Sequence, residues 1–306
     1  MKHAYLVMAA DEFEELKILL GALDHEDNAV FLHIDRKVDL SSEMLDELKN
    51  SVSRARLRLA PRRKVSWGGR DMLECEFALF SLARSSGPFD YYHLLSGKDL
   101  PIAGHRQIDA FFEKNRGREF VEYKQIEESE VYQRVRFYHA FPNVSAYRSV
   151  DSRFLKFAVR AYRKAERTVQ GMLGIDLFRG TGLELGFGSQ WLSLDDLAVE
   201  RILANERKIM KIFRHAIVAD ELFLQTFIIN DPVLRERLYR DEDGRLTSLR
   251  YIEIDSRQSS PRVWRISDRE RLKQAHDAGY LFSRKFDVTE DKEIVSHILK
   301  LTEEEQ

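Results

Sequence analysis

The sequence predicts an α/β fold with a mixed, mostly parallel central sheet flanked by helices. Short apolar runs of strand length alternate with helical patterns from the first residues onward, which is typical of strands joined by helices. The chain has 306 residues, of which 43% are hydrophobic, enough to bury a sizeable core. We expect one domain over 1–306, with a nucleotide-binding half at 1–118 and an acceptor-binding and catalytic half at 119–306.

The first half contains four short apolar runs, each followed by a helical pattern. We expect Asp11 to cap the first helix and Ser41 or Ser42 to open the second, because their side-chain oxygens can accept hydrogen bonds from the first turn. The predicted strands are 4–10, 29–34, 57–60 and 91–95, and the predicted helices are 12–23, 42–51, 71–83 and His105–Lys114.

The second half is richer in aromatic and basic residues. Residues 120–123 and 249–254 have strand-like patterns, and Asp195 is expected to start a helix that runs to Asn205. Further helices are predicted at 152–173, at 222–229 and over the tail 268–301, around residues 282–287.

Composition and charge exclude several classes of protein. The formal net charge is −2, which argues against a nucleic-acid binder. Cys75 is the one cysteine of the sequence, so neither an intramolecular disulfide nor a cysteine zinc site is possible. The apolar run after Lys2-His3 is too short for a signal peptide or a membrane span. We therefore expect a cytoplasmic protein.

The predicted helix 152–173 carries six basic residues and the single acid Glu166. Two interpretations remain open. The row of charges can be an ordinary solvated helix face, or it can rest on the anionic inner face of a membrane as a peripheral contact.

Common nucleotide and hydrolase motifs are absent from the sequence. It has no Gly-x-x-x-x-Gly-Lys phosphate loop, no Gly-x-Gly-x-x-Gly after a strand and no Gly-x-Ser-x-Gly, which argues against nucleotide hydrolysis, dinucleotide redox chemistry and serine hydrolysis. The histidines lack the spacing of metal ligands. The acidic run 241–243 has Arg240, Gly244 and Arg245 as neighbours, so we expect an exposed turn there and no metal site.

Two stretches place charges beside apolar runs. Lys98 and Asp99 follow the apolar run 91–95, at the strand end where ligands of α/β sheets bind; a solvated ion pair in a turn is the alternative. Asp220-Glu221 lies between the apolar segments 216–219 and 222–224. These acids can supply a general base at a helix N-terminus, or serve as an N-cap with a first-turn acid.

Seven segments carry a resemblance to a known family. In chain order they are AYLV at 4–7, FLHIDRK at 31–37, VSWGG at 65–69, YYHLLSGKDLPI at 91–102, GSQWLS at 188–193, ADELFLQ at 219–225 and RKFD at 284–287. Together they resemble the core-2/I-branching β-1,6-N-acetylglucosaminyltransferase family, which includes the peptide O-xylosyltransferases. The match looks like a bacterial member that lacks the amino-terminal anchor and the many cysteines of the animal Golgi enzymes.

The resemblance implies a GT-A-like fold, a UDP-sugar donor, an inverting transfer and no required metal or other cofactor. Carried over residue by residue, Glu221 matches the general base and Lys285 matches the lysine on the donor diphosphate. Arg262 is the best match for a second cation there, with Arg265 as its rival. The turn at Asp99 would help to shape the donor pocket where metal-dependent relatives of the fold keep an Asp-x-Asp.

The resemblance also implies where the two substrates bind. Ala9, Asp35, Ser66 and Trp67 would lie near the nucleotide, together with Asp99. Glu122 resembles an acceptor-binding glutamate, and Trp191 would flank the sugar pocket.

The leading interpretation is an inverting glycosyltransferase that moves N-acetylglucosamine, or xylose or another sugar, from a UDP-sugar to a glycan. We expect the acceptor to be an intermediate in cell-surface polysaccharide assembly. If it is lipid-linked, helix 152–173 would dock on the membrane. The alternative is a catalytically inactive nucleotide- or glycan-binding protein of the same fold, and a retaining or metal-dependent transferase is a third option.

Overall fold

The computed structural model describes residues 1–125, 130–143, 152–255 and 260–303. Its central sheet has five strands in the order β3-β2-β1-β4-β8. The strands are β1 (His3–Ala9), β2 (Asn28–Ile34), β3 (Arg56–Leu59), β4 (Tyr91–Ser96) and β8 (Ser193–Asp195). The first four are parallel, and β8 runs antiparallel to β4. The predicted mixed, mostly parallel sheet is confirmed.

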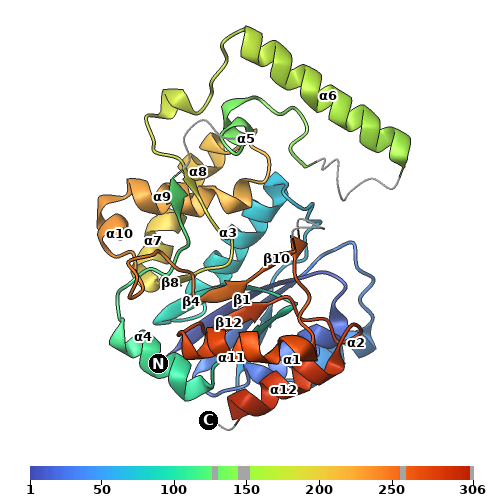
Figure 1. Cartoon of the computed structure of the whole chain (residues 1–306), viewed down its shortest axis with the longest axis vertical. Coiled ribbons are helices and arrows are strands. Elements are labelled where there is room, and N and C mark those ends of the chain that lie inside the picture. Colours follow the sequence, from blue (N-terminus) through green and yellow to red (C-terminus); the bar gives the residue numbers. More distant parts are fainter. Residues whose placement is uncertain (126–129, 144–151, 256–259, 304–306) are drawn as a thin grey trace.

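Helices cover both faces of this sheet (Figure 1). Along β1, Ala4, Leu6 and Met8 enter one core while Tyr5 and Val7 enter the other, because successive side chains of a strand point to opposite faces. Four helices pack on the first core: α3 (Arg70–Arg84), α7 (Asp196–Ala204), α8 (Glu206–Ile212) and α9 (Phe223–Asn230). Five helices pack on the second core: α1 (Phe13–Ala22), α2 (Ser42–Asn50), α4 (His105–Lys114), α11 (Arg269–Asp277) and α12 (Lys292–Glu303). Burial on both faces explains why β1, β2 and β4 are mostly apolar, whereas the edge strand β3 alternates arginine and leucine and is mostly exposed.

A second, three-stranded sheet has the order β5-β12-β9. Its strands are β5 (Asp99–Pro101), β12 (Phe282–Arg284) and β9 (Arg250–Ile252). The predicted helical tail is therefore interrupted by a strand, because Phe282 and Ser283 are buried between β5 and β9. The prediction of a strand at 120–123 is wrong: Phe120 makes an isolated bridge to Ser193, and the nearest strand is β6 (Lys124–Gln125), paired with β7 (Gly186–Phe187).

The remaining elements are short, apart from α6. They are α5 (Gln133–Arg136), α6 (Arg153–Met172), α10 (Pro232–Glu236), β10 (Ile254–Asp255), β11 (Ser260–Pro261) and the 3₁₀ turns η1 (Arg179–Thr181), η2 (Ala219–Glu221) and η3 (Ile266–Asp268). In Figure 1, α6 stands at the end of the molecule farthest from α12. Within the described ranges, no helix combines the length and apolarity that a membrane crossing requires.

Two of the predicted helix caps form and one does not. The Ser41 side chain accepts a hydrogen bond from the Met44 amide (3.2 Å), and that of Asp195 accepts one from the Ala198 amide (2.9 Å). The cap at Asp11 is wrong. Glu12 is the N-cap residue of α1, and its carboxylate accepts from the Ala10 amide instead (3.0 Å).

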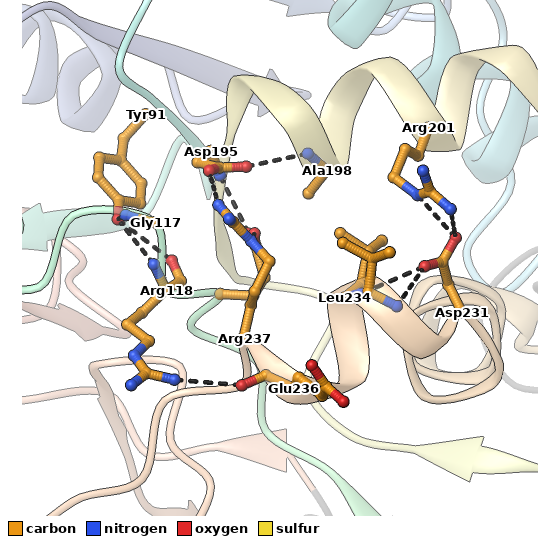
Figure 2. A network of polar contacts seen from close by, with 12 residues as sticks. Tyr91, Gly117, Arg118, Asp195, Ala198, Arg201, Asp231, Leu234, Glu236 and Arg237 are labelled. Carbon is orange, nitrogen blue, oxygen red and sulfur yellow. Dashed lines mark hydrogen bonds and ion pairs between the residues drawn. The ribbon is translucent and has the colours of Figure 1, made fainter.

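A buried ion network fastens β8, α7 and α10 to the edge of the sheet (Figure 2). The Arg237 guanidinium, just after α10, donates to the fully buried carboxylate of Glu119 (3.1 Å) and to Asp195. Burial, together with the nearby Asp195 carboxylate, raises the pKa of Glu119 to about 8. All three residues belong to the predicted second half of the chain, and β8 joins that half to the first by pairing with β4.

Candidate active site

The carboxyl ends of β1 and β2 bring together several residues that the sequence marks as nucleotide-binding. The Asp35 amide donates to the carbonyl of Ala9 (2.9 Å), so the two strand ends touch. The Asp35 carboxylate is buried and accepts from the amides of Lys37 (2.8 Å) and Val65 (3.3 Å). Asp35 thus anchors the start of the 65–69 segment at the sheet edge where ligands of α/β proteins bind.

The 65–69 segment continues across this edge. The Ser66 amide donates to the Asp71 carboxylate (2.9 Å), and the Trp67 side chain is 41% exposed. Gly68 adopts a φ of +66°, which glycine tolerates without strain, and its carbonyl accepts from the Val218 amide (2.8 Å). This hydrogen bond places the segment directly beside the turn that carries Glu221.

Glu221 ends the 3₁₀ turn η2, which follows Val218 in the left-handed conformation (φ +50°). A β-branched residue rarely adopts this conformation. The Glu221 carboxylate is 34% exposed and accepts a 2.7 Å hydrogen bond from Arg134 Nη1 on α5. The structure therefore presents Glu221 at the surface of a turn and orients it by an ion pair.

Asp220 points the other way and is buried. It is not a helix cap, because Leu222 is the N-cap residue of α9 and no side chain caps that helix. Burial, with the neighbouring Glu221 carboxylate, raises the pKa of Asp220 to about 7. Behind it, burial raises the pKa of Glu76 on α3, and Asp220 adds to the effect. Gln190 donates to Glu76 (3.0 Å).

The two predicted cations lie on neighbouring stretches of backbone. The Lys285 amide donates to the Arg262 carbonyl (3.2 Å), and the Trp264 amide donates to the Lys285 carbonyl (2.9 Å). The Arg262 guanidinium is 39% exposed and pairs with Asp268 (2.6 Å). The rival Arg265 instead pairs with Glu290 (2.6 Å), in the turn that precedes α12. The geometry thus favours Arg262 as the partner of Lys285.

Asp99 and Lys98 do not form the ion pair that their adjacency suggests. Lys98 pairs with Asp287 (2.6 Å), whereas Asp99, 1% exposed, accepts from the Ser96 hydroxyl (2.6 Å) and pairs with Arg284 (3.3 Å). The prediction of a mutual pair is wrong because Asp99 begins β5, and neighbouring side chains of extended backbone point to opposite sides.

Trp191 links the cation segment to the Glu221 turn. The Arg284 guanidinium lies 4.5 Å from the centre of the Trp191 ring, a cation–π contact, and Arg284 directly precedes Lys285. Trp191 belongs to the loop after β7, and at the other end of this loop the Gly188 amide donates to the Glu221 carbonyl (3.0 Å). One loop therefore contacts the backbone of Glu221 at one end and the residue that precedes Lys285 at the other.

Glu122 joins the same loop from the opposite side. A Cβ atom on Gly188 would lie 1.8 Å from the Glu122 carbonyl oxygen, so glycine alone fits this crossing. The Glu122 carboxylate is 35% exposed and pairs with Lys124 (3.1 Å). It lines a groove of about 610 Å³ together with Tyr123 and Tyr251. Aromatic and charged walls of this kind suit a polar ligand such as a glycan.

No cluster of three or more histidine, cysteine or acidic side chains with metal-binding geometry occurs in 1–125, 130–143, 152–255 or 260–303. The acidic run after Arg240 forms the exposed turn that the sequence predicts, with Asp243 66% exposed and paired with Arg245 (3.3 Å).

Three side chains of this region escape prediction from sequence. Arg134 contacts the predicted site residue Glu221 and Arg284 contacts Asp99, at separations of 87 and 185 positions. Glu76 accepts from Gln190, the neighbour of Trp191, at a separation of 114 positions. No local motif marks such pairs.

This region holds the part-exposed Glu221 carboxylate beside the 65–69 segment and two cations on neighbouring backbone, and a separate polar groove is lined by Glu122. A carboxylate that can accept a proton and cations that can stabilise an anionic leaving group are the groups that an enzyme needs to transfer a group from an anionic donor. Residues 3–273 match the family model of the Core-2/I-Branching enzymes. The chain belongs to this family of glycosyltransferases.

Curated relatives agree with that assignment. Xylosyltransferase 2 of Rattus norvegicus is 23% identical over 305 residues, covering 95% of this chain and 32% of the relative. Xylosyltransferase oxt of Drosophila melanogaster is 22% identical over 285 residues, covering 88% and 30%. The chain thus spans about a third of the length of the curated relatives it matches. Among solved structures, the apo form of mouse xyloside xylosyltransferase 1 aligns with a TM-score of 0.36 and 10% identity, covering 76% of this chain and 84% of that one.

Proposed function

We propose that the protein is an inverting glycosyltransferase that moves a sugar from a UDP-sugar to a glycan hydroxyl. The observation that carries the proposal is the loop between Gly188 and Trp191, which contacts the turn of Glu221 at one end and the segment of Lys285 at the other. A carboxylate and a cation are the two charges that a single displacement at a sugar carbon requires.

In this proposal Glu221 takes the proton of the acceptor hydroxyl. The hydroxyl oxygen then attacks the anomeric carbon from the face opposite UDP, and the bond between that carbon and the β-phosphate oxygen breaks. The ion pair with Arg134 (2.7 Å) would hold the Glu221 carboxylate in place during the attack.

Negative charge grows on the diphosphate as UDP leaves. Lys285 and Arg262 would stabilise that charge, each by about 3 kcal/mol in the transition state, in the role that a divalent metal ion has in other transferases. Arginine contributes two parallel donors and lysine a compact charge. The proposal therefore includes no metal and no other cofactor.

The nucleotide would lie over Ala9, Asp35 and the 65–69 segment, with Ser66 and Trp67 at its side. Asp99 would act through Arg284, because its carboxylate is engaged with Ser96 and Arg284. The acceptor would occupy the groove at Glu122, with Trp191 beside the transferred sugar. We expect this acceptor to be a precursor of a cell-surface polysaccharide.

Two donors compete in this proposal. The resemblance of the seven sequence segments favours UDP-N-acetylglucosamine, whereas the curated relatives are named as xylosyltransferases, which favours UDP-xylose. A screen of UDP release with both donors and a panel of glycan acceptors separates the two candidates.

The same screen tests the catalytically inactive alternative. UDP release that depends on the acceptor supports a transferase. A thermal shift with UDP or a UDP-sugar, without release from any donor, would instead indicate a nucleotide-binding protein of this fold.

A further inference from the structure

Among the residues that the structure describes, α6 contacts the rest of the protein along the side that carries Glu166 and Gln170. Glu166, whose side chain is 7% exposed, accepts from His139 (2.9 Å), the Ala140 amide (3.1 Å) and Arg163 (3.2 Å). One turn later, Gln170 exchanges two hydrogen bonds with the backbone of Tyr138 (2.7 and 2.8 Å). These contacts fix the orientation of α6, yet none of its residues is buried.

Large apolar side chains cover the side of α6 that faces away from these contacts. At 100° per residue, Phe154, Phe157, Ala161 and Met172 point to one sector, roughly opposite the side defined by Glu166 and Gln170. The exposed fractions along and just beyond the helix are 79% for Phe154, 70% for Phe157, 55% for Val169, 81% for Met172 and 70% for Leu173. Phe154 and Phe157 near the start of α6 and Met172 at its end are exposed on one side of the helix, with small side chains such as Ala161 between them, and such exposed apolar side chains mark an interaction surface.

A row of basic residues borders this apolar row. Arg153, Lys156, Arg160, Lys164 and Arg167 recur at intervals of three or four residues, so they share one side of the helix. Glu166 is the one acid of the helix and is turned inward to His139 and Arg163. The outer surface of α6 therefore presents positive charge and apolar side chains together.

We propose that α6 is an interfacial helix that docks the protein on an anionic phospholipid bilayer. Phe154, Phe157 and Met172 would enter the boundary between headgroups and acyl chains, and the basic row would lie along the lipid phosphates. Charge complementarity selects this occupant. Two copies of α6 packed face to face would bring two positive rows together, which disfavours self-association through this face.

Binding of the full chain to vesicles tests the proposal. We expect cosedimentation with vesicles of phosphatidylcholine and phosphatidylglycerol, and little with phosphatidylcholine alone. A charge near an anionic surface contributes about fivefold in binding. The loss of three positive charges alone weakens binding by about 100-fold, and the charge reversal in K156E/R160E/K164E should weaken it by more than about 100-fold. The variant F154S/F157S should also lose at least about tenfold, since two inserted side chains are removed.

The structure offers a matched control on α8, where Arg207, Lys208 and Lys211 are exposed. The variant R207E/K208E/K211E changes the net charge equally and should bind vesicles far better than the α6 charge variant. All three variants should keep the circular dichroism and thermal unfolding of the wild type, because none replaces a buried residue. UDP release with a soluble acceptor should also persist, so failure here is distinguishable from failure of the proposed transferase.

Three results would overturn the proposal. The first is wild-type protein that ignores anionic vesicles. The second is equal binding by K156E/R160E/K164E and the wild type. The third is a stable dimer in sedimentation equilibrium that F154S/F157S converts to monomer, which would assign the apolar row to a second copy of the chain.

Discussion

Replacing Glu221 by glutamine separates a catalytic role from a structural one. In Glu221→Gln the side chain keeps its shape and an oxygen that can accept the 2.7 Å hydrogen bond from Arg134, but an amide cannot take up a proton at neutral pH. A positioned general base contributes about 10²–10⁴ in rate. We therefore expect turnover to fall at least ~100-fold, which raises the barrier by about 2.7 kcal/mol.

The expected cost in stability is much smaller. The side chains of Glu221 and Arg134 are 34% and 27% exposed, and pairs so accessible to water contribute only up to about 1 kcal/mol. The free energy of unfolding should thus change by less than about 1 kcal/mol, while the activation barrier changes by more than twice that amount.

UDP release at saturating donor and acceptor measures the first quantity, and urea unfolding measures the second. Glu200→Gln is the matched control, because Glu200 also pairs with an arginine, Arg84, at 2.8 Å, with side chains 56% and 35% exposed. It should unfold like Glu221→Gln and keep full turnover. Turnover of Glu221→Gln within a few-fold of the wild type would refute the role of Glu221 as the base.

Three further perturbations follow from the structure. Lys285→Ala should lower turnover by ~100-fold or more, since one pre-organised charge is worth about 3 kcal/mol. The control Arg265→Ala, which breaks the exposed pair with Glu290, should retain most of the turnover. Equal losses of UDP release in the two variants would contradict the role given to Lys285. Arg237→Ala leaves the buried Glu119 carboxyl without its arginine. Because the pKa of Glu119 is about 8, this group can hold a proton at neutral pH, so the free energy of unfolding should fall by about 1–3 kcal/mol, the cost of an unpaired buried polar group; an unchanged free energy of unfolding in urea would count against it. Asp220 binds its proton more tightly when folded, with a pKa of about 7 against an ordinary 3.8, so its contribution to stability falls as pH rises between these values, by up to about 4 kcal/mol. The free energy of unfolding of Asp220→Asn should therefore rise relative to that of the wild type as the pH increases. If urea unfolding gives parallel pH profiles for the two proteins, Asp220 does not have the raised pKa.

The elements that could be predicted from sequence are those defined by local pattern. The strands β1, β2 and β4 appear as apolar runs because both of their faces are buried, and α4 and α6 have helical periodicity. The β12 strand could not be foreseen, because its pairing with β5 and β9 joins segments far apart in the chain.

The same distinction applies to the site. Asp220-Glu221 could be singled out because it interrupts a buried apolar segment, whereas Asp35 is marked as a site residue only by the resemblance of segment 31–37 to the family. The pairs Arg134–Glu221 and Asp99–Arg284 depend on how the chain folds back on itself, and adjacency alone wrongly paired Lys98 with Asp99. The backbone hydrogen bond from Lys285 to Arg262, which supports proposing Arg262 over Arg265, also joins segments far apart in the chain.

The central claim is that protein cations take up the charge of departing UDP. The direct test is the rate of UDP release by the wild type, with the preferred donor and acceptor, after exhaustive treatment with EDTA. The account predicts a rate equal to that of the untreated enzyme, with no gain from added Mn²⁺ or Mg²⁺. A rate that collapses on chelation and returns with either ion would contradict the roles given to Lys285 and Arg262.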